Sequence, residues 1–317
     1  MMNVECGKMN KGKTLRVEAN SASKSLFVII ANPVSGTKSA PALAQRVKRL
    51  LEGAGQQAEL RLTKWPGDAL ALAAEAVSKG AAVVTGCGGD GTLQEIATAL
   101  DGAPAALGLL PQGRCNDFAR ALGFSKKETP ETLARVLLQK RPRRVDLGAL
   151  GSRRFLTVAT LGFDSEVSRF VETHRMWLKG TPAYLYGVVR VLLNFKAPLV
   201  RLAGDFGRYE SRCLLAATGN TPCYGGAMRI TPGAKLDDGI FQICAVREVS
   251  SLTVLRIMPR VMAGTHISHP AVTLLTSRTV QVETPERPVW ICADGESLGQ
   301  TPCKLEIHPG ALQVLAP

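Results

Sequence analysis

The chain has 317 residues, of which 45% are hydrophobic and 21% charged, so it can form about two globular domains and is not disordered as a whole. Its formal net charge of +13 favours an anionic partner, such as a nucleotide or an acidic membrane surface. Aromatic residues make up only 5%, which counts against proteins that stack single-stranded nucleic acid on aromatic side chains, and we expect no nucleic-acid partner.

The first residues of the chain do not look like a folded segment. Residues 1–24 are basic and lack the apolar stretch of a secretory signal, so we predict a disordered tail there. Gly7–Thr14 matches the P-loop expression letter for letter, but no strand pattern precedes it and no helical period follows it, so we expect no nucleotide there. No segment reaches the roughly 18 apolar residues of a membrane span. The eight cysteines contain no C-x-x-C pair, which favours reduced thiols in a cytoplasmic protein.

From Ser25 onward, apolar runs typical of strands alternate with helical patterns. The expected strands are Leu26–Ile30, Ala58–Leu62, Ala81–Val84 and Ala106–Leu110. Helices are expected after the cap-and-proline pair Ser39 and Pro41, after Asp68 as a cap, and after Thr92, with a short helix at Phe118–Leu122. This alternation predicts βαβ units and a parallel sheet over residues 25–145.

The segments that follow these four strands are polar or rich in glycine. They are Asn32–Gly36, Thr63–Lys64, Gly86–Thr92 and Pro111–Asn116. Open α/β sheets bind ligands beyond the carboxyl ends of their strands, so we expect the four segments to share one site. In Gly88–Thr92 (GGDGT), glycines would let the backbone approach phosphates, and Asp90 would hold Mg²⁺ or a substrate hydroxyl. The alternative is a tight turn with a capping aspartate.

Beyond about Val145, short apolar runs separated by Gly, Pro and Asp predict a mostly β second domain over residues 146–317, whose last strand could return to the first domain. The expected strands are Phe155–Thr160, Leu214–Thr218, Ile240–Val246, Val272–Leu275 and Val289–Cys292, with one helix at Ala183–Leu193. The basic segment Lys140–Arg144 marks the expected junction. The arginines at 141, 143, 144, 153 and 154 form either a solvated face or a membrane-contacting patch.

Three pairs of polar or acidic residues stand at expected turns or helix starts. Asn116–Asp117 opens the short helix, and Asp237–Asp238 and Asp294–Glu296 lie in turns of the second domain. On spacing alone, Asp-Gly turns are more often hairpin turns than catalytic sites.

In this order, the motifs resemble those of the bacterial lipid kinases of the diacylglycerol kinase catalytic-domain family, relatives of sphingosine and ceramide kinases. The resembling stretches run along nearly the whole chain and are Asn32–Gly36, Gly88–Glu95, Pro111–Arg120, Gly162–Glu166, Tyr224–Gly226, Pro232–Gly239, Asp294–Glu296 and Pro309–Leu312. GGDGT also occurs in NAD kinases and phosphofructokinases, so the specificity lies in the ordered set.

The resemblance implies an ATP- and Mg²⁺-dependent lipid kinase that phosphorylates the hydroxyl of diacylglycerol or a similar lipid alcohol, with ATP between an α/β domain and a β-rich domain. It implies that Glu296 is the general base, with Asp294 beside it, and that Asp90 is catalytic. A structural Mg²⁺ would bind Asp238 and the backbone oxygens of Lys235 and Ile240. The implied nucleotide-binding residues are Asn32, Pro33, Ser35, Gly36, Thr63, Gly88, Gly89, Asp90, Gly91, Thr92, Leu93, Gln94, Arg114 and Asn116.

One position departs from the family pattern, because Arg114 stands where the family usually has threonine. A guanidinium there would either pair with phosphate or crowd the site. Two alternatives therefore stay open: a kinase of soluble substrates of the NAD kinase type, and a non-catalytic regulator that binds nucleotide or lipid. The lipid substrate and the net positive charge together predict a cytoplasmic protein that binds an anionic membrane surface peripherally, and a homodimer is left open.

Overall fold

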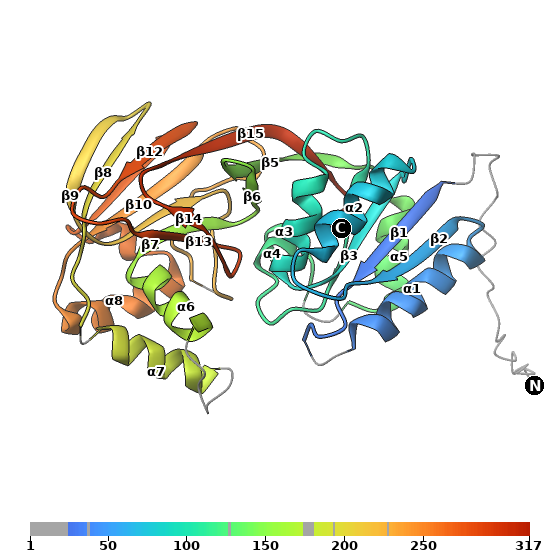
Figure 1. The fold of residues 1–317 in the computed structure, drawn as a ribbon, viewed down its shortest axis with the longest axis horizontal. Helices are drawn as coiled ribbons and strands as arrows, with labels where there is room; N and C mark the ends of the chain where they lie inside the picture. The colour runs from blue at the N-terminus through green and yellow to red at the C-terminus, as the bar shows by residue number, and fades with distance from the viewer. Residues whose placement is uncertain (1–24, 37–38, 126–127, 174–180, 193, 227) are drawn as a thin grey trace, which may run out of the picture.

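The computed structural model describes residues 25–36, 39–125, 128–173, 181–192, 194–226 and 228–317 (Figure 1). The tail expected at residues 1–24 and the P-loop-like segment Gly7–Thr14 lie outside the described residues. Two units lie side by side, an α/β unit and a β-rich unit, and the long strand β15 (Cys303–Val314) runs from the second to the first.

The first unit has a parallel sheet in the order β2-β1-β3-β4, as the alternating pattern predicts. Its strands are β1 (Leu26–Ala31), β2 (Gln57–Leu62), β3 (Val83–Gly88) and β4 (Ala106–Pro111). Its helices are α1 (Ala40–Gly53), α2 (Asp68–Ser78), α3 (Asp90–Ala99), α4 (Asp117–Ala121) and α5 (Pro130–Gln139). Because β1 and β3 are almost fully buried and rich in apolar residues, the sheet is the centre of this unit's core.

The strand order determines where a ligand can bind. The chain leaves β1 toward β2 on one side, whereas β3 lies on the other side of β1. Because crossover connections are right-handed, the helix that follows β1 and the helix that follows β3 lie on opposite faces of the sheet. The two segments that lead into these helices therefore separate from each other at the carboxyl edge of the sheet. This divergence is the crevice where such sheets bind ligands, and both predicted segments, Asn32–Gly36 and Gly86–Thr92, end there.

The second unit is mostly β, which confirms the predicted fold class. Its strands, apart from β15, are β5 (Arg143–Leu150), β6 (Arg153–Phe155), β7 (Val158–Gly162), β8 (Leu199–Gly204), β9 (Gly207–Gly219), β10 (Phe241–Arg247), β11 (Val272–Ser277), β12 (Thr279–Glu283), β13 (Trp290–Ala293) and β14 (Glu296–Gln300). Its helices are α6 (Phe163–Thr173), α7 (Thr181–Leu192) and α8 (Ser251–Ala263), with a 3₁₀ turn at His266–Ser268.

Strand β9 takes part in both layers of this unit. Its first half pairs with β8, and its second half pairs with β7 and β10, so the chain passes from one sheet layer to the other within one strand. A separate apolar core fills the space between, where the rings of Phe155 and Phe241 stack with centroids 5.7 Å apart. The second unit therefore has its own core rather than an extension of the first.

Several expectations about individual elements were wrong. The expectation of a single helix, at Ala183–Leu193, matches α7 but omits α6 and α8. The expected strand Phe155–Thr160 is two strands, because the amides of Leu156 and Thr157 donate to Asp294 instead of a neighbouring strand. The expected cap Asp68 is the first helical residue after Gly67, and it accepts a hydrogen bond from the amide of Lys64.

The buried carboxylate of Asp146 connects strand β5 to the loop before β10 and to strand β15. It accepts hydrogen bonds of 2.7 Å from the amides of Gly239 and Gly310, and its own amide donates to the carbonyl of Leu236. Burial raises the pKa of Asp146, the two amides lower it, and the nearby Asp237 and Asp238 raise it. The carboxylate is thus the shared acceptor at this junction.

We expect Asp146→Ala to lower the free energy of unfolding by about 2–3 kcal/mol, because two amides lose their acceptor in a buried place. Urea unfolding measures this loss. The control is Glu52→Ala, which removes an exposed carboxylate paired with Lys48 and should cost about 0.5 kcal/mol or less. Equal losses for the two variants would show that Asp146 does not hold the junction.

Candidate active site

The first carboxylate of the site, Asp90, begins helix α3 directly after β3. Gly89 is the N-cap in an extended conformation, so the chain enters the helix without a side chain at that point. Burial raises the pKa of Asp90, and the neighbouring Asp117 raises it further. The backbone amides of Asn116, Asp117 and Phe118 act in the opposite direction, and the Phe118 amide lies 3.4 Å from Oδ1 of Asp90. Asp90, the first residue of α3, therefore links the N-terminus of α3 to that of α4 through its contact with the Phe118 amide.

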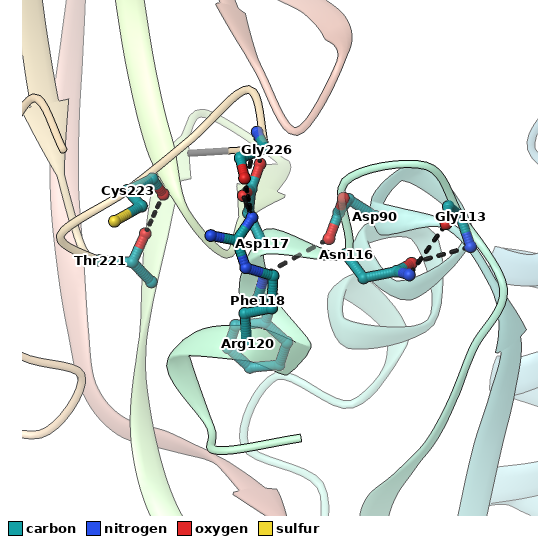
Figure 2. A network of polar contacts seen from close by, with 9 residues as sticks. All are labelled: Asp90, Gly113, Asn116, Asp117, Phe118, Arg120, Thr221, Cys223 and Gly226. Carbon is teal, nitrogen blue, oxygen red and sulfur yellow. Dashed lines mark hydrogen bonds and ion pairs between the residues drawn. The ribbon is translucent and has the colours of Figure 1, made fainter. Parts of the chain in front are cut away.

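Asp117, the first residue of α4, holds a loop of the second unit (Figure 2). Both of its carboxylate oxygens accept from the amide of Gly226, at 2.9 and 3.1 Å. Arg120 completes the network, because one of its nitrogens lies 3.2 Å from Asp117 and also donates to the carbonyl of Gly226. Burial raises the pKa of Asp117, and the Gly226 amide and Arg120 lower it. This buried pair ties the two units together at the edge of the site.

Asn116 shapes the loop between β4 and α4. Its backbone is left-handed, with φ of 49°, and its side chain bonds both the amide and the carbonyl of Gly113, at 2.8 and 2.9 Å. A Cβ at Gly113 would lie 2.6 Å from the Cα of Gly89, so only glycine fits this approach of the two loops. Asn116 is thus the N-cap residue of α4 by position, but its side chain closes the Gly113 turn and makes no capping hydrogen bond.

The acidic turn Asp294–Glu296 is the tip of the β13–β14 hairpin. Asp294 and Gly295 both have positive φ, of 53° and 87°, which is the geometry of a tight two-residue hairpin turn. Asp294 accepts from the amides of Leu156 and Thr157, at 2.6 and 3.1 Å, and from the Thr157 hydroxyl at 2.5 Å. Burial raises the pKa of Asp294 to about 7, these hydrogen bonds lower it, and Asp90 raises it.

Glu296 lies on the other side of the same turn. A Cβ placed on Gly91 would be 3.0 Å from Oε1 of Glu296, so this carboxylate lies against the first turn of α3. The hairpin tip of the second unit therefore reaches the start of the helix that follows the GGDGT segment. Residues about 200 positions apart in the sequence meet at this point.

Two cavities lie on either side of this turn. The first, of about 330 Å³, is lined by residues after β1, β2 and β3 and by Glu296, and we call it the rim cavity. The second, of about 460 Å³, lies between the units, and we call it the cleft cavity. Asp90, Asp117 and Asp294 line it together with apolar atoms of Val158, Tyr224 and Ala293. One turn thus presents a carboxylate to each cavity.

The rim cavity brings together half of the residues expected to bind nucleotide, which are Asn32, Pro33, Ser35, Thr63, Gly89, Gly91 and Thr92. The others lie elsewhere. Leu93 is buried in the core, and the Gln94 side chain donates to the carbonyl of Arg154. Gly36 and Gly88 are points of close packing, where a Cβ would meet Gln112 and Thr92. Asp90 and the exposed Arg114 line the cleft cavity instead.

The rim cavity is also lined by residues that were not among the expected nucleotide-binding residues, and three of them, Trp65, Pro66 and Ala69, lie outside the predicted segments and motifs. Val34, Lys64, Trp65, Pro66, Ala69 and Glu95 line it as well. The Trp65 side chain is 61% exposed although it lines a cavity, and Glu95 accepts from the amides of Gly67 and Ala69. Trp65 had a sequence signal, since it is one of three tryptophans and follows directly on the expected Thr63–Lys64 segment.

The residues expected to bind a structural Mg²⁺ are in one loop before β10. Oδ1 of Asp238 accepts from the amide of Ile240 at 3.1 Å, and Lys235 lies three residues before Asp238. Within the described ranges, no three His, Cys, Asp or Glu side chains gather as a metal site. A carboxylate with backbone oxygens is a donor set that Mg²⁺ accepts, so this site stays a prediction.

The raised pKa of Asp294 predicts a change of stability with pH. Because its folded-state pKa of about 7 exceeds the ordinary value near 4, the folded protein retains a proton that the unfolded chain loses, and stability falls as pH rises from about 4 to about 7. Asp294→Asn cannot titrate, so the free energy of unfolding of the wild type should fall relative to that of the variant across this window. Asp205→Asn, in an exposed turn, is the control. A constant difference between wild type and Asp294→Asn would contradict the assignment.

Comparisons with known proteins identify the family and the fold of both units. A family model described as the diacylglycerol kinase catalytic domain matches residues 26–150, and one described as the YegS C-terminal NAD kinase beta sandwich-like domain matches residues 157–316. A solved structure of a diacylglycerol kinase from Bacillus anthracis has a TM-score of 0.70 at 21% identity, over 93% of this chain and 97% of the other, which shows the fold alone.

Curated relatives add closer similarity. The "Probable lipid kinase YegS-like" protein of Chromohalobacter salexigens is 34% identical over 282 residues, covering 87% of this chain and 89% of its own. The "Diacylglycerol kinase" of Mycobacterium tuberculosis is 32% identical over 295 residues, covering 91% of this chain and 94% of its own. With both units matched along nearly their whole length, the chain belongs to the diacylglycerol kinase and YegS-like lipid kinase family and is a lipid kinase.

Proposed function

We propose that the enzyme transfers the γ-phosphoryl group of Mg²⁺-ATP to the hydroxyl of diacylglycerol or a similar lipid alcohol. The observation that carries this proposal is the position of the Asp294–Glu296 turn between the two cavities. In this assignment ATP binds in the rim cavity and the lipid hydroxyl enters the cleft cavity. The transferred group then moves past the carboxylates at the turn.

The rim cavity has the features of a phosphate-binding site. Gly89 and Gly91 place backbone amides at the N-terminus of α3, where the helix dipole favours negative charge. Asn32, Ser35 and Thr63 add polar side chains, and Lys64 adds a cation. Trp65 supplies an exposed aromatic face at which a base can stack. We therefore assign the phosphates to the glycine segment and the base toward Trp65.

The cleft cavity suits the alcohol end of a lipid. Its lining combines apolar side chains with carboxylates, and α6 contributes Asp164 and Ser168. Arg114 lines this cavity too, so its contact with the nucleotide would be at the phosphoryl group that is transferred. A guanidinium there offsets negative charge as the phosphoryl group moves.

A carboxylate must accept the proton of the alcohol as the oxygen attacks phosphorus. Asp294 already accepts three hydrogen bonds from the chain, which suits it to hold the hairpin tip in place. We assign the general base to Glu296, which follows Gly295 of the cleft-cavity lining and lies against the N-terminus of α3, so that it stands at the border of the two cavities; Asp294 lies beside it, and Asp90 orients the phosphate or the acceptor.

Magnesium would neutralise charge on the phosphates during transfer. Mg²⁺ in kinases is usually bound by one or two carboxylates together with the substrate's phosphates. Asp90 and Asp294 fit this role, since burial raises the pKa of both carboxyls and Asp90 raises the pKa of Asp294 further through its like charge. The second site, at Asp238 with the carbonyls of Lys235 and Ile240, we propose as structural.

The substrate also determines where the enzyme must work. Among the described residues, no helix is both long enough and apolar enough to span a bilayer. We propose that the protein acts from the cytoplasm at an anionic membrane surface, to which its net charge of +13 attracts it.

Replacing the proposed base should abolish most of the turnover. We expect Glu296→Gln to lower kcat by about 10²–10⁴-fold while ATP still binds, because only proton transfer is lost. The assay follows labelled γ-phosphate into diacylglycerol, monoacylglycerol, ceramide, sphingosine and phosphatidylglycerol in mixed micelles, with NAD as a soluble acceptor. The acceptor that is labelled names the substrate class.

The matched control is Glu283→Gln, an exposed carboxylate on β12 away from both cavities. Wild-type turnover by Glu296→Gln would overturn the assignment of the base. Labelling of NAD alone would favour a soluble-substrate kinase, and ATP binding without labelling of any acceptor would favour a non-catalytic regulator.

Trp65 should report nucleotide binding directly. We expect saturating Mg²⁺-ATP to change the tryptophan fluorescence of the wild type and of Trp290→Phe, but not that of Trp65→Phe. Trp65→Ala should weaken ATP binding by about 5–30-fold, as loss of one stacked base does. Trp290 is the control because it lies in β13 beneath Arg169, 4.2 Å from the ring centroid. A signal that persists in Trp65→Phe would place the nucleotide elsewhere.

A further inference from the structure

Helix α8 carries apolar side chains on a face that nothing in the described chain covers. Leu252 is 56% exposed, Met258 40% and Met262 46%. The helix is properly terminated, because the Ser250 side chain caps its first turn and Gly264 ends it in a left-handed conformation. Both ends of the helix are therefore capped, Pro259 removes one backbone donor inside it, and its outer surface is unusually apolar.

These side chains form one stripe. At about 100° per residue, Leu252, Met258 and Met262 lie within an arc of about 120°. The opposite arc carries Ile257 and Val261, which pack on the second unit. One apolar face thus attaches α8 to the protein, and a separate apolar face, the outer stripe, points away from it.

The charged side chains of α8 itself have a single sign. Arg256 and Arg260 are exposed beside Leu252, and the helix contains no Asp or Glu; the nearest acid before it in the sequence is the exposed Glu248. An apolar stripe beside cations, on a helix without acidic residues, is the pattern of helices that lie in the surface of an anionic bilayer. A water-exposed helix face would normally carry charges of both signs.

The helix is also on a suitable side of the molecule. Figure 1 shows α6, α7 and α8 along the same side of the second unit, and α6 lines the cleft cavity. Exposed Tyr186 and Val189 of α7 add apolar surface on that side. By contrast, three of the five arginines in and next to β5 and β6 bond to groups of the protein: Arg144 to Gly310, Arg153 to Ser297 and Arg154 to Asp101. The membrane-contacting patch suggested by that cluster is thus the weaker candidate.

We infer that the outer stripe of α8 is the surface by which the enzyme docks on an anionic lipid bilayer, with Leu252, Met258 and Met262 entering the headgroup region and Arg256 and Arg260 contacting lipid phosphates. This inference rests on the proposed function, because a lipid substrate gives the enzyme reason to bind a bilayer. It assigns a helix outside both cavities to membrane binding and not to catalysis.

The test separates binding from chemistry. Binding of the full chain is measured by co-sedimentation with vesicles of phosphatidylcholine alone and of phosphatidylcholine with phosphatidylglycerol. We expect the wild type to bind the anionic vesicles and the double variant Leu252→Glu/Met262→Glu to bind them about tenfold more weakly or worse. Arg256→Gln/Arg260→Gln should lose about fivefold for each arginine, and only on anionic vesicles at low salt.

Two controls accompany these variants. Leu138→Glu changes an apolar side chain of α5 that is 36% exposed on the first unit, and its vesicle binding should match that of the wild type. Turnover of diacylglycerol dispersed in detergent micelles should be unchanged in the α8 variants, because neither cavity is altered. Thermal unfolding at the wild-type temperature shows that they are folded.

Vesicle binding by Leu252→Glu/Met262→Glu equal to that of the wild type would overturn the inference. So would a dimer in light scattering that this variant dissociates, because the stripe would then bind a second copy of the chain. If the wild type binds vesicles through α8 but phosphorylates no lipid in micelles, the proposed function fails and the docking surface stands.

Discussion

Three carboxylates, of Asp90, Asp117 and Asp294, are withdrawn from water where the two units meet, and backbone amides compensate for much of the lost hydration. Burial alone would favour the neutral acids, and the pKa of each is raised. Gly226 of the second unit donates to Asp117 of the first, whereas Leu156 and Thr157 donate to Asp294 within the second unit. Separating the units would leave the buried Asp117 without its amide donor, so this carboxylate helps to position the two units.

This constraint explains why one short turn can serve two cavities. The β13–β14 hairpin is held by the hydrogen bonds of Asp294, so Glu296 projects from a fixed point against α3. Asp117 and Arg120 hold the Gly226 loop at the far edge of the cleft cavity. In the proposed reaction, the second unit places Asp294 and Glu296 beside a helix start that the first unit supplies. That arrangement would hold two substrates in position, which is most of what phosphoryl transfer requires.

Most of the first unit was predictable because its strands and helices are determined by short-range sequence patterns. Strand runs such as Leu26–Ile30 and helices ended by glycine follow from hydrophobic period and caps, and the observed β1 and α1 agree with them. The second unit was predicted less well. Helix α8 was missed although Ser250 and Gly264 bracket it, because its apolar residues lie on two faces and obscure a single helical period. The division of β6 from β7 depends on Asp294, which is more than 130 residues away.

The sequence by itself determined the fold class, the rim at the ends of the parallel strands, and the ordered motifs that indicate a lipid kinase. These are properties of short segments, and period, glycine and capping chemistry encode them. Only the tertiary structure decided that Glu296 faces Gly91, that Leu93 and Gln94 point into the protein, and that Arg114 faces the cleft cavity. The physical reason is that burial and long-range hydrogen bonds depend on two segments that are far apart in the sequence. The local pattern of one segment does not show which other segment will pack against it.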